Sequence, residues 1–402
     1  MTAQTTNSSE IRLPSGFRFT GTHCGVKASA KDLAVIACDS PATATGVYTQ
    51  NLVRAASIDW NRQITPSSTV AGVVINSGNA NACTGEQGKR DNQQMAATTA
   101  AELGCEADQI LVLSTGVIGQ SLPMDRLLPG IPEAVSQMGD KSSSFLDAAD
   151  AIMTTDRFRK ISSRSFTCDS ANLCIAGMAK GAGMIGPNLA TMLAILVTDC
   201  YLSPQDADRA LRSAATASFN CISVEGHTST NDAVLLLSSS QGTPLREPKQ
   251  LLEFEKNLTE TCIDLAKQIP ADGEGATHVI EIRVEGATAD TAADRIARTI
   301  AQSALVKTAF TGADPNWGRI VSAAGYAGVE FDLSECSLTL NGHTVFRAGQ
   351  PTPFDASVVS KDLRQNRDAQ VVLSVGQGTG QATHWTSDLT IDYVKLNSEY
   401  TT

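Results

Sequence analysis

Residues 180–191 read KGAGMIGPNLAT, and the run that overlaps their end, 189–197, is mostly apolar. Three glycines keep the first part small and adaptable, because glycine adopts backbone conformations that other residues avoid. The apolar run that follows is typical of a buried element. The sequence therefore predicts a glycine-rich turn that leads directly into the core of the fold, with Thr191 at the junction.

The segments on both sides of this junction alternate between strand-like and helix-like periods, which predicts an α/β fold. The predicted strands are 70–75, 110–113, 233–237, 278–284, 337–340, 370–375 and 389–394, and the predicted helices are 92–103, 124–138, 204–218, 249–268 and 288–303. Residues 139–165 are rich in Ser and Thr and poor in bulky apolar residues. We expect a surface connection there, with a domain boundary close by.

Composition and charge exclude several classes of protein. The chain has 402 residues, with 31 Lys and Arg against 42 Asp and Glu, so its formal net charge is −11. This balance argues against a nucleic-acid partner, since phosphate contacts need clustered basic side chains. An apolar share of 42% with 18% charged residues indicates a folded chain with a large core. No apolar run approaches the roughly 18 residues of a membrane span, so we expect no membrane partner.

The cysteines and the N-terminal residues bear on the compartment. The ten cysteines are scattered without a CxxC pair, which predicts reduced thiols in packed positions and no metal site. Residues 1–12 are polar and lack the apolar region of a signal peptide. We therefore expect a cytoplasmic protein.

A dinucleotide-binding loop is the sharpest rival interpretation of the glycines. Gly181, Gly183 and Gly186 have the G-x-G-x-x-G spacing, and Asp199 follows near the position of the fingerprint's acidic residue. That fingerprint requires the glycines to open a crossover helix, followed by a further strand. The Pro-Asn pair at 187–188 and the short run 189–197 leave no room for both elements, so the sequence disfavours a nucleotide site.

Two interpretations of Thr191 stay open from its spacing alone. It is either an ordinary β-forming residue at the start of a core segment or a nucleophile freed by cleavage of the Ala190–Thr191 bond. In the second case its new α-amine, with an ordinary pKa of about 7.7–8.0, acts as the base that activates its hydroxyl. The glycine-rich approach and the rigid segment after it suit such a site. Spacing alone favours the plain turn.

The segment 180–199 resembles the self-cleavage segment of the ornithine acetyltransferases, also called glutamate N-acetyltransferases, of arginine biosynthesis. The resemblance covers nearly the whole chain. Six further blocks occur in the family order, at 76–85 (NSGNANACTG), 114–119 (STGVIG), 152–156 (IMTTD), 272–276 (DGEGA), 314–319 (DPNWGR) and 396–402 (LNSEYTT). Seven matching blocks are far more specific than any one of them.

The resemblance implies a layered α/β fold of the self-processing, N-terminal-nucleophile-like kind. It implies self-cleavage at Ala190–Thr191 into an α chain, 1–190, and a β chain, 191–402, assembled as a heterotetramer. The implied activity moves an acetyl group from N-acetylornithine to glutamate through acetyl-Thr191, without a bound cofactor. Acetyl-coenzyme A is a second donor in some members, which makes those enzymes multifunctional.

The matching positions also imply roles for individual residues. Thr115 and Gly116 correspond to the pair that stabilises the oxyanion, where a hydroxyl and a backbone N–H approach the developing charge. Lys180 and Glu274 offer opposite charges to a zwitterionic amino acid. The implied substrate contacts are Thr154, Lys180, Thr191, Glu274, Asn397 and Thr402.

Two other functions compete with acetyl transfer. A self-cleaving aminopeptidase on a similar fold would use the same N-terminal threonine, with water in place of the acceptor amine. A small-molecule binding protein could have kept the fold and lost processing. The presence of Thr191, Gly116 and Glu274 counts against the second of these alternatives.

Overall fold

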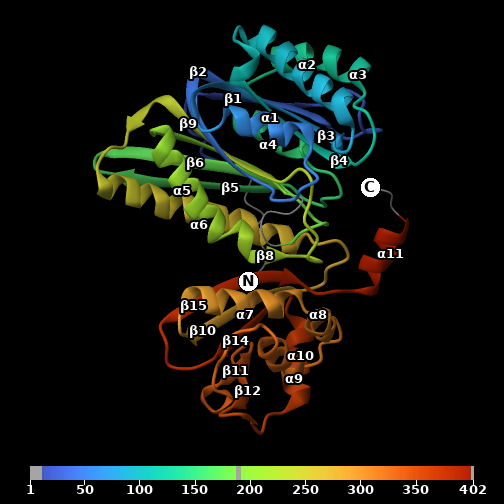
Figure 1. The fold of residues 1–402 in the computed structure, drawn as a ribbon, viewed down its shortest axis with the longest axis vertical. Coiled ribbons are helices and arrows are strands. Elements are labelled where there is room, and N and C mark those ends of the chain that lie inside the picture. Colours follow the sequence, from blue (N-terminus) through green and yellow to red (C-terminus); the bar gives the residue numbers. More distant parts are fainter. Residues whose placement is uncertain (1–10, 187–191, 400–402) are drawn as a thin grey trace.

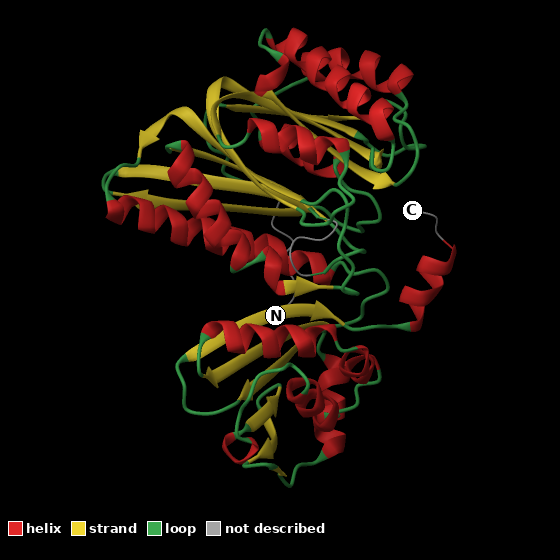
Figure 2. Cartoon of the chain, viewed as in Figure 1, coloured by secondary structure: helices red, strands yellow, loops and turns green. Residues whose placement is uncertain are grey.

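The computed structural model describes residues 11–186 and 192–399 and forms two sheets with their covering helices (Figures 1 and 2). The strands are β1 (Phe17–Thr22), β2 (Leu33–Tyr48), β3 (Ser67–Asn79), β4 (Ile110–Val117), β5 (Lys160–Cys168), β6 (Ala171–Lys180), β7 (Leu193–Tyr201), β8 (Ile222–Ser223), β9 (Ala233–Pro244), β10 (Val279–Ala287), β11 (Ser337–Leu340), β12 (His343–Arg347), β13 (Gln350–Pro351), β14 (Asp368–Ser374) and β15 (Gly380–Ser387). The helices are α1 (Ala56–Ile64), α2 (Gly85–Leu103), α3 (Met124–Ser136), α4 (Ser142–Ala151), α5 (Pro204–Thr216), α6 (Pro248–Ala271), α7 (Asp290–Gln302), α8 (Ala304–Thr311), α9 (Trp317–Gly325), α10 (Ala356–Gln365) and α11 (Ile391–Glu399).

The first sheet has the strand order β4-β3-β2-β9-β7-β6-β5, with β1 paired to β2. Its residues alternate between two cores, as the two-residue period of a strand requires. On β2 and β3, Val35 and Val74 pack with α2 and α3, whereas Ile36 and Val73 face the opposite side. On β7, Leu196 packs with α5 and α6 while its neighbours face inward. Helices therefore cover both outer faces (Figure 2). A further apolar core, which includes Ile58 of α1 and Phe145 of α4, packs between the two halves of the sheet.

Strands from the two predicted chains interleave in this sheet. β9 and β7, which both come after residue 191, pair with each other, and this pair is hydrogen-bonded to β2 on one side and to β6 on the other. At the end of the sheet near the functional motifs, Lys180 lies opposite Leu193, and Leu193 lies opposite Ala233. The division into chains of 1–190 and 191–402 stays a prediction. A cut between β6 and β7 would nevertheless leave the two parts bound to one another.

The second sheet has the order β13-β12-β11-β14-β10-β15-β8 and forms the lower lobe in Figure 1. Helix α7 packs on β10 and β15 through residues such as Ile296 and Ile300, which share a core with Ile282 of β10. Strand β8, which follows α5 and a short turn, pairs with β15 through Ile222 and Trp385. Trp385 also belongs to the α5–α6 core of the first sheet. The two lobes are therefore joined by both backbone pairing and apolar packing.

The layered α/β architecture predicted from the sequence is confirmed, but two local predictions are wrong. Residues 139–165 are no surface connection, because they contain α4 and the start of β5. Phe145 of α4 is fully buried and meets Phe19 edge to face at 5.2 Å, while small alanines bury the rest of that helix face. Residues 389–394 are not a strand either. The Thr390 hydroxyl accepts the backbone N–H of Tyr393, which suits the start of α11 at Ile391.

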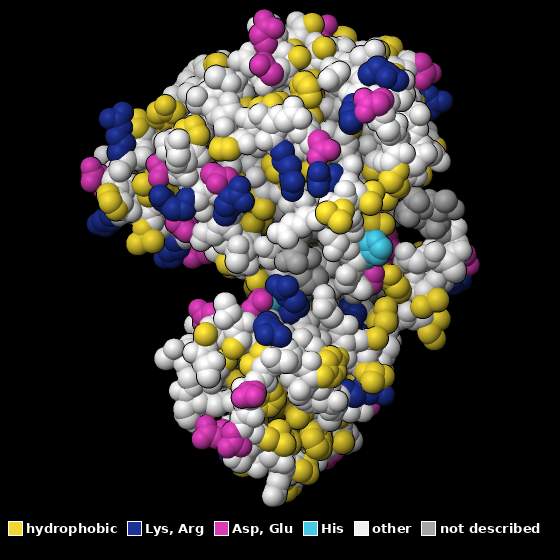
Figure 3. Space-filling model, in the orientation of Figure 1, with side chains coloured by type: hydrophobic (Ala, Val, Ile, Leu, Met, Phe, Trp, Pro, Cys, Tyr) yellow, Lys and Arg dark blue, Asp and Glu magenta, His cyan; other side chains and the backbone are white. Residues whose placement is uncertain are grey.

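None of the described helices combines the length and apolar character needed to cross a membrane. On the face shown in Figure 3, basic and acidic side chains are interspersed, and the basic ones do not gather into one patch.

Candidate active site

The ends of β3 and β4 place Thr115 and Gly116 at one edge of the first sheet. The two strands are parallel, and their last pairs bring Gly116 opposite Gly78. Gly116 has a φ of +134°, and a Cβ at this position would lie 2.2 Å from the backbone carbon of Gly78. Both the conformation and the close approach therefore require glycine here. Thr115, next to it, is buried with 3% of its surface exposed.

Lys180 is the last residue of β6 and points at Thr115. Its ammonium group donates a hydrogen bond of 3.2 Å to the Thr115 hydroxyl oxygen, and both side chains are buried. Burial lowers the pKa of Lys180, and the nearby Asp156 carboxylate opposes that effect. Because the Thr115 oxygen accepts from the ammonium, its own O–H is free to donate to another acceptor.

A buried ionic cluster holds the loops on either side of β6. The Lys160 ammonium lies 2.6 Å from Asp156 Oδ1 and 2.7 Å from Asp272 Oδ2, and all three side chains are fully buried. Asp156 also accepts the backbone N–H groups of Gly181 at 2.7 Å and Thr154 at 2.9 Å. Burial opposes ionisation of Asp156, but the neighbouring ammonium groups hold its pKa well below the usual range. One carboxylate thus positions both the glycine loop and the Thr154 loop.

Glu274 is carried by the loop that begins at Asp272, just after α6. Its backbone N–H donates to the carbonyl of Ala182 at 2.9 Å, which ties this loop to the glycine loop. A Cβ on Gly183 would lie 2.6 Å from the Glu274 carboxylate, so glycine at 183 is what lets the two approach. The Asn397 amide of α11 donates to Glu274 Oε2 at 2.9 Å.

These loops enclose one pocket with an empty volume of about 640 Å³, counting the space open to solvent. Six residues singled out from the sequence line it: Thr115, Gly116, Thr154, Lys180, Glu274 and Asn397. The remaining ones, Ala190, Thr191 and Thr402, lie outside the described residues. A second hollow of about 1200 Å³ adjoins the pocket at Thr155 and Glu274 and runs along α11.

The sequence analysis missed one wall of the pocket, which Ser229, Thr230 and Asn231 form just before β9. The Asn231 amide donates to the carbonyls of Ala80 at 2.6 Å and Ser114 at 2.8 Å, so it binds this wall to the ends of β3 and β4. The sequence does contain a signal for this wall. Four consecutive polar residues, 229–232, stand directly before the apolar run 233–237, at the same kind of strand end that carries the other site residues.

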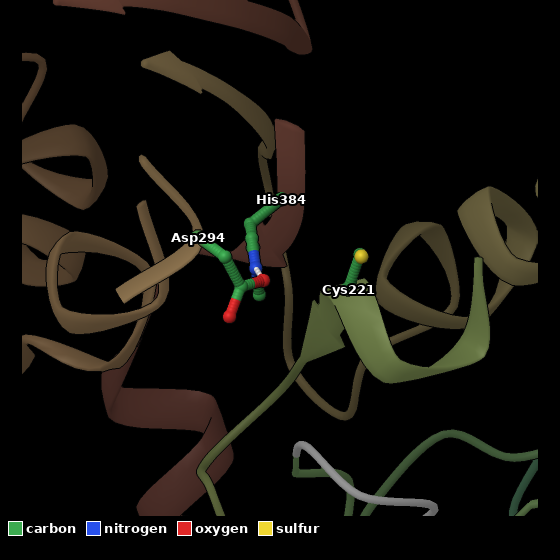
Figure 4. Close-up of side chains that lie close together, drawn as sticks. All are labelled: Cys221, Asp294 and His384. Atoms are coloured by element: carbon green, nitrogen blue, oxygen red, sulfur yellow. Dashed lines mark hydrogen bonds and ion pairs between the residues drawn. The ribbon is translucent and has the colours of Figure 1, made fainter. Parts of the chain in front are cut away.

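A second cluster, outside the pocket, contains three side chains of types that can bind metals. The potential ligand atoms of Cys221, Asp294 and His384 lie within 4.8 Å of one another (Figure 4). His384 Nε2 lies 2.8 Å from Asp294 Oδ1, and the Arg298 guanidinium lies 3.2 Å from Asp294 Oδ2. The Cys221 thiol donates to the carbonyl of Thr216 at 3.2 Å. Since a guanidinium already pairs with the carboxylate, we describe this cluster as an ion-pair network joining α7 to β15.

Comparison with known proteins identifies the family. The ArgJ family model matches residues 18–402. This chain belongs to the ArgJ family. It is 46% identical over 395 residues to the arginine biosynthesis bifunctional protein ArgJ of Rhodopirellula baltica, covering 97% of this chain and 96% of that protein. It is 43% identical over 391 residues to the ArgJ protein of Geobacter sulfurreducens, covering 96% of this chain and 99% of that protein.

Among solved structures, the chain is similar to the ornithine acetyltransferase of Mycobacterium tuberculosis complexed with ornithine. That similarity has 38% identity and a TM-score of 0.41, and it covers 46% of this chain and 97% of the other. The family membership predicted from the seven sequence blocks is confirmed by the family match and the ArgJ relatives.

The buried cluster around Lys160 leads to a prediction about stability. Replacing Lys160 with Met leaves two buried carboxylates without their shared cation, so we expect a loss of about 3–5 kcal/mol. The loss is measured as a lower urea midpoint of unfolding. The matched control is Lys89→Met, which breaks the exposed pair with Glu86 and should leave the midpoint close to that of wild type, because solvent screens such pairs. Equal midpoints for the two variants would contradict the central role of Lys160.

Proposed function

We propose that this ArgJ family member is a glutamate N-acetyltransferase of arginine biosynthesis. It moves an acetyl group from N-acetylornithine to glutamate through an acetyl ester on Thr191, after cutting itself at Ala190–Thr191. The observation that carries the proposal is the single pocket in which six residues from five separate sequence blocks meet. Membership of a family whose relatives are named bifunctional proteins of arginine biosynthesis supports the same reaction, with acetyl-coenzyme A as a second donor.

The charges in the pocket suit a donor of this class. N-acetylornithine carries a carboxylate and an ammonium group at opposite ends of a short chain, and glutamate also carries both charges. Lys180 at the end of β6 and Glu274 on the loop after α6 offer the complementary pair, and the oxyanion candidates Thr115 and Gly116 of β4 line the same pocket. We assign substrate contact to Lys180, Glu274, Thr154 and Asn397, together with Thr191 and Thr402.

The reaction uses one nucleophile twice. The Thr191 oxygen attacks the acetyl carbonyl carbon of the donor, and its proton passes to its own α-amine. The tetrahedral oxygen accepts hydrogen bonds from the Thr115 hydroxyl and the Gly116 N–H. The C–N bond to ornithine then breaks, and the ornithine nitrogen takes the proton. The amine of glutamate attacks the acetyl ester in the same way and releases N-acetylglutamate and the free hydroxyl.

Assembly and compartment complete the proposal. We place the enzyme in the cytosol, because all ten cysteines are free and persistent free thiols are typical of a reducing compartment. The interleaved strands β2, β9, β7 and β6 would hold the α and β chains together after cleavage. We propose a heterotetramer of two α and two β chains, as the resemblance implies.

Self-processing can be tested directly on the purified protein. We expect two fragments on a denaturing gel, with the second beginning at Thr191 by N-terminal sequencing. Thr191→Ala removes the hydroxyl that attacks the Ala190 carbonyl, so this variant should stay uncut and should not transfer acetyl groups. Initial rates of the cut wild type should follow ping-pong kinetics. An intact chain in active preparations, or hydrolysis of peptides without acetyl transfer, would contradict the proposal.

The role of Thr115 predicts a specific kinetic defect. Thr115→Ala removes a donor that acts mainly in the transition state, so kcat should fall on the order of 10²–10³-fold with a much smaller change in KM. Thr115→Ser keeps the hydroxyl and is the matched control. Both rates are normalised to cut β chain, because the same hydroxyl can assist maturation. A raised KM with unchanged kcat would make Thr115 a binding residue instead.

A further inference from the structure

Asp232 is a fully buried carboxylate that the reaction described above does not use. It stands one residue before β9, beside the pocket wall formed by residues 229–231. Its Oδ1 accepts the backbone N–H of Met192 at 2.9 Å. Its Oδ2 is buried and has no hydrogen-bond partner within the described ranges 11–186 and 192–399. A buried oxygen of this kind is costly to leave without a donor, so a donor is expected to meet it.

The groups around Asp232 are few. Burial raises its pKa well above the usual range, and the Met192 N–H, the Lys180 ammonium, the Ser229 N–H and the nearby Thr49 hydroxyl oppose that shift. The Thr49 hydroxyl donates to the Ser229 carbonyl at 2.7 Å, so it does not supply the missing donor. Lys180 is the charged side chain acting on it, and Lys180 is itself influenced by Asp156, Lys160 and Glu274. Asp232 therefore interacts electrostatically with Lys180, which lines the pocket.

The strand register and the covalent chain indicate which hydrogen-bond donor lies near Asp232. Leu193 lies opposite Ala233 in the parallel pair of β7 and β9, so the residues just before these two strands are neighbours. The Met192 nitrogen that Asp232 binds is bonded to the carbonyl carbon of residue 191. The nitrogen of Thr191 is three bonds from the Met192 nitrogen, so these two nitrogens lie within about 4 Å of one another in any conformation.

We infer that Asp232 is the positioning residue of the nucleophile: its free oxygen accepts a hydrogen bond from the α-amino group that cleavage creates on Thr191. This inference rests on the proposed function. The amine must present its lone pair to the Thr191 hydroxyl in order to take its proton, and a hydrogen bond from one of its N–H groups to a fixed carboxylate orients it for that task. An ammonium group beside Asp232 opposes the effect of burial and favours the carboxylate, and the carboxylate in turn favours the ammonium form, so activity is lost at a higher pH as the solution is acidified.

The test compares Asp232→Asn with wild type in acetyl transfer from N-acetylornithine to glutamate, normalised to cut β chain. We expect kcat to fall on the order of tenfold, since orientation is lost, while KM stays within about twofold. The acidic limb of the kcat/KM profile should move down by about 1 pH unit or more, because the carboxylate no longer stabilises the ammonium. Asp199→Asn is the matched control. Asp199 is partly buried toward the other end of β7, where it accepts the Cys174 N–H at 2.7 Å, and its variant should behave as wild type.

An unchanged pH profile and kcat in cut Asp232→Asn would overturn the inference. If that variant stays uncut, the test is made on cut wild type instead. The pKa of the Thr191 α-amine is measured from its rate of labelling by trace fluorodinitrobenzene as a function of pH. A neighbouring carboxylate favours the ammonium form, so a pKa of the amine at or above the ordinary range of about 7.7–8.0 supports the inference, and a value below that range contradicts it. If wild type is cut and its amine has a pKa at or above the ordinary range, yet it transfers no acetyl group, the proposed function is refuted while the inference about Asp232 stands.

Discussion

The Lys160 ammonium, buried between the carboxylates of Asp156 and Asp272, is the interaction on which the pocket depends. Through Asp156 it fixes the backbone of Gly181, where the glycine loop leaves β6, and the backbone of Thr154. Through Asp272 it fixes the start of the loop that carries Glu274. Three segments far apart in the sequence thus converge on one buried cation, which pairs with a carboxylate from each of the other two segments. This arrangement positions Lys180 and Glu274, the two charged residues that line the pocket.

The sheet explains how such a protein could cut its own chain and keep its shape. The segment between Lys180 and Leu193 connects two neighbouring antiparallel strands, so it lies at one end of the sheet and not within it. The strands on both sides of this segment are held by other strands and by two apolar cores. The hydrogen bonds and apolar contacts that hold these strands therefore do not involve the peptide bond at the junction. Strand ends that are held in this way can supply the groups that act on the connection between them.

Sequence reasoning predicted the strand ends that matter and missed contacts that depend on distant residues. The apolar runs 110–113 and 233–237 predicted β4 and β9, and Thr115, Gly116, Lys180 and Glu274 were found because they sit in recognisable blocks. Lys160 was missed, because a lysine in a Ser-rich segment gives no sign that two carboxylates 4 and 112 residues away will bury it. Helix α4 was missed for a related reason, since alanine packs well only against a surface that the sequence does not display. Asp232 stood in a visible polar run, but its free oxygen is apparent only in three dimensions.

The central claim is that this pocket forms an acetyl ester on Thr191 and holds its carbonyl at Thr115 and Gly116. The most direct measurement is a crystal structure of the cut protein soaked with N-acetylornithine in the absence of glutamate. The account predicts density for one acetyl group on the Thr191 oxygen, with its carbonyl oxygen about 2.7–3.1 Å from the Thr115 hydroxyl and the Gly116 nitrogen, and ornithine between Lys180 and Glu274. An acetyl group on another side chain, or a donor bound outside these residues, would contradict it.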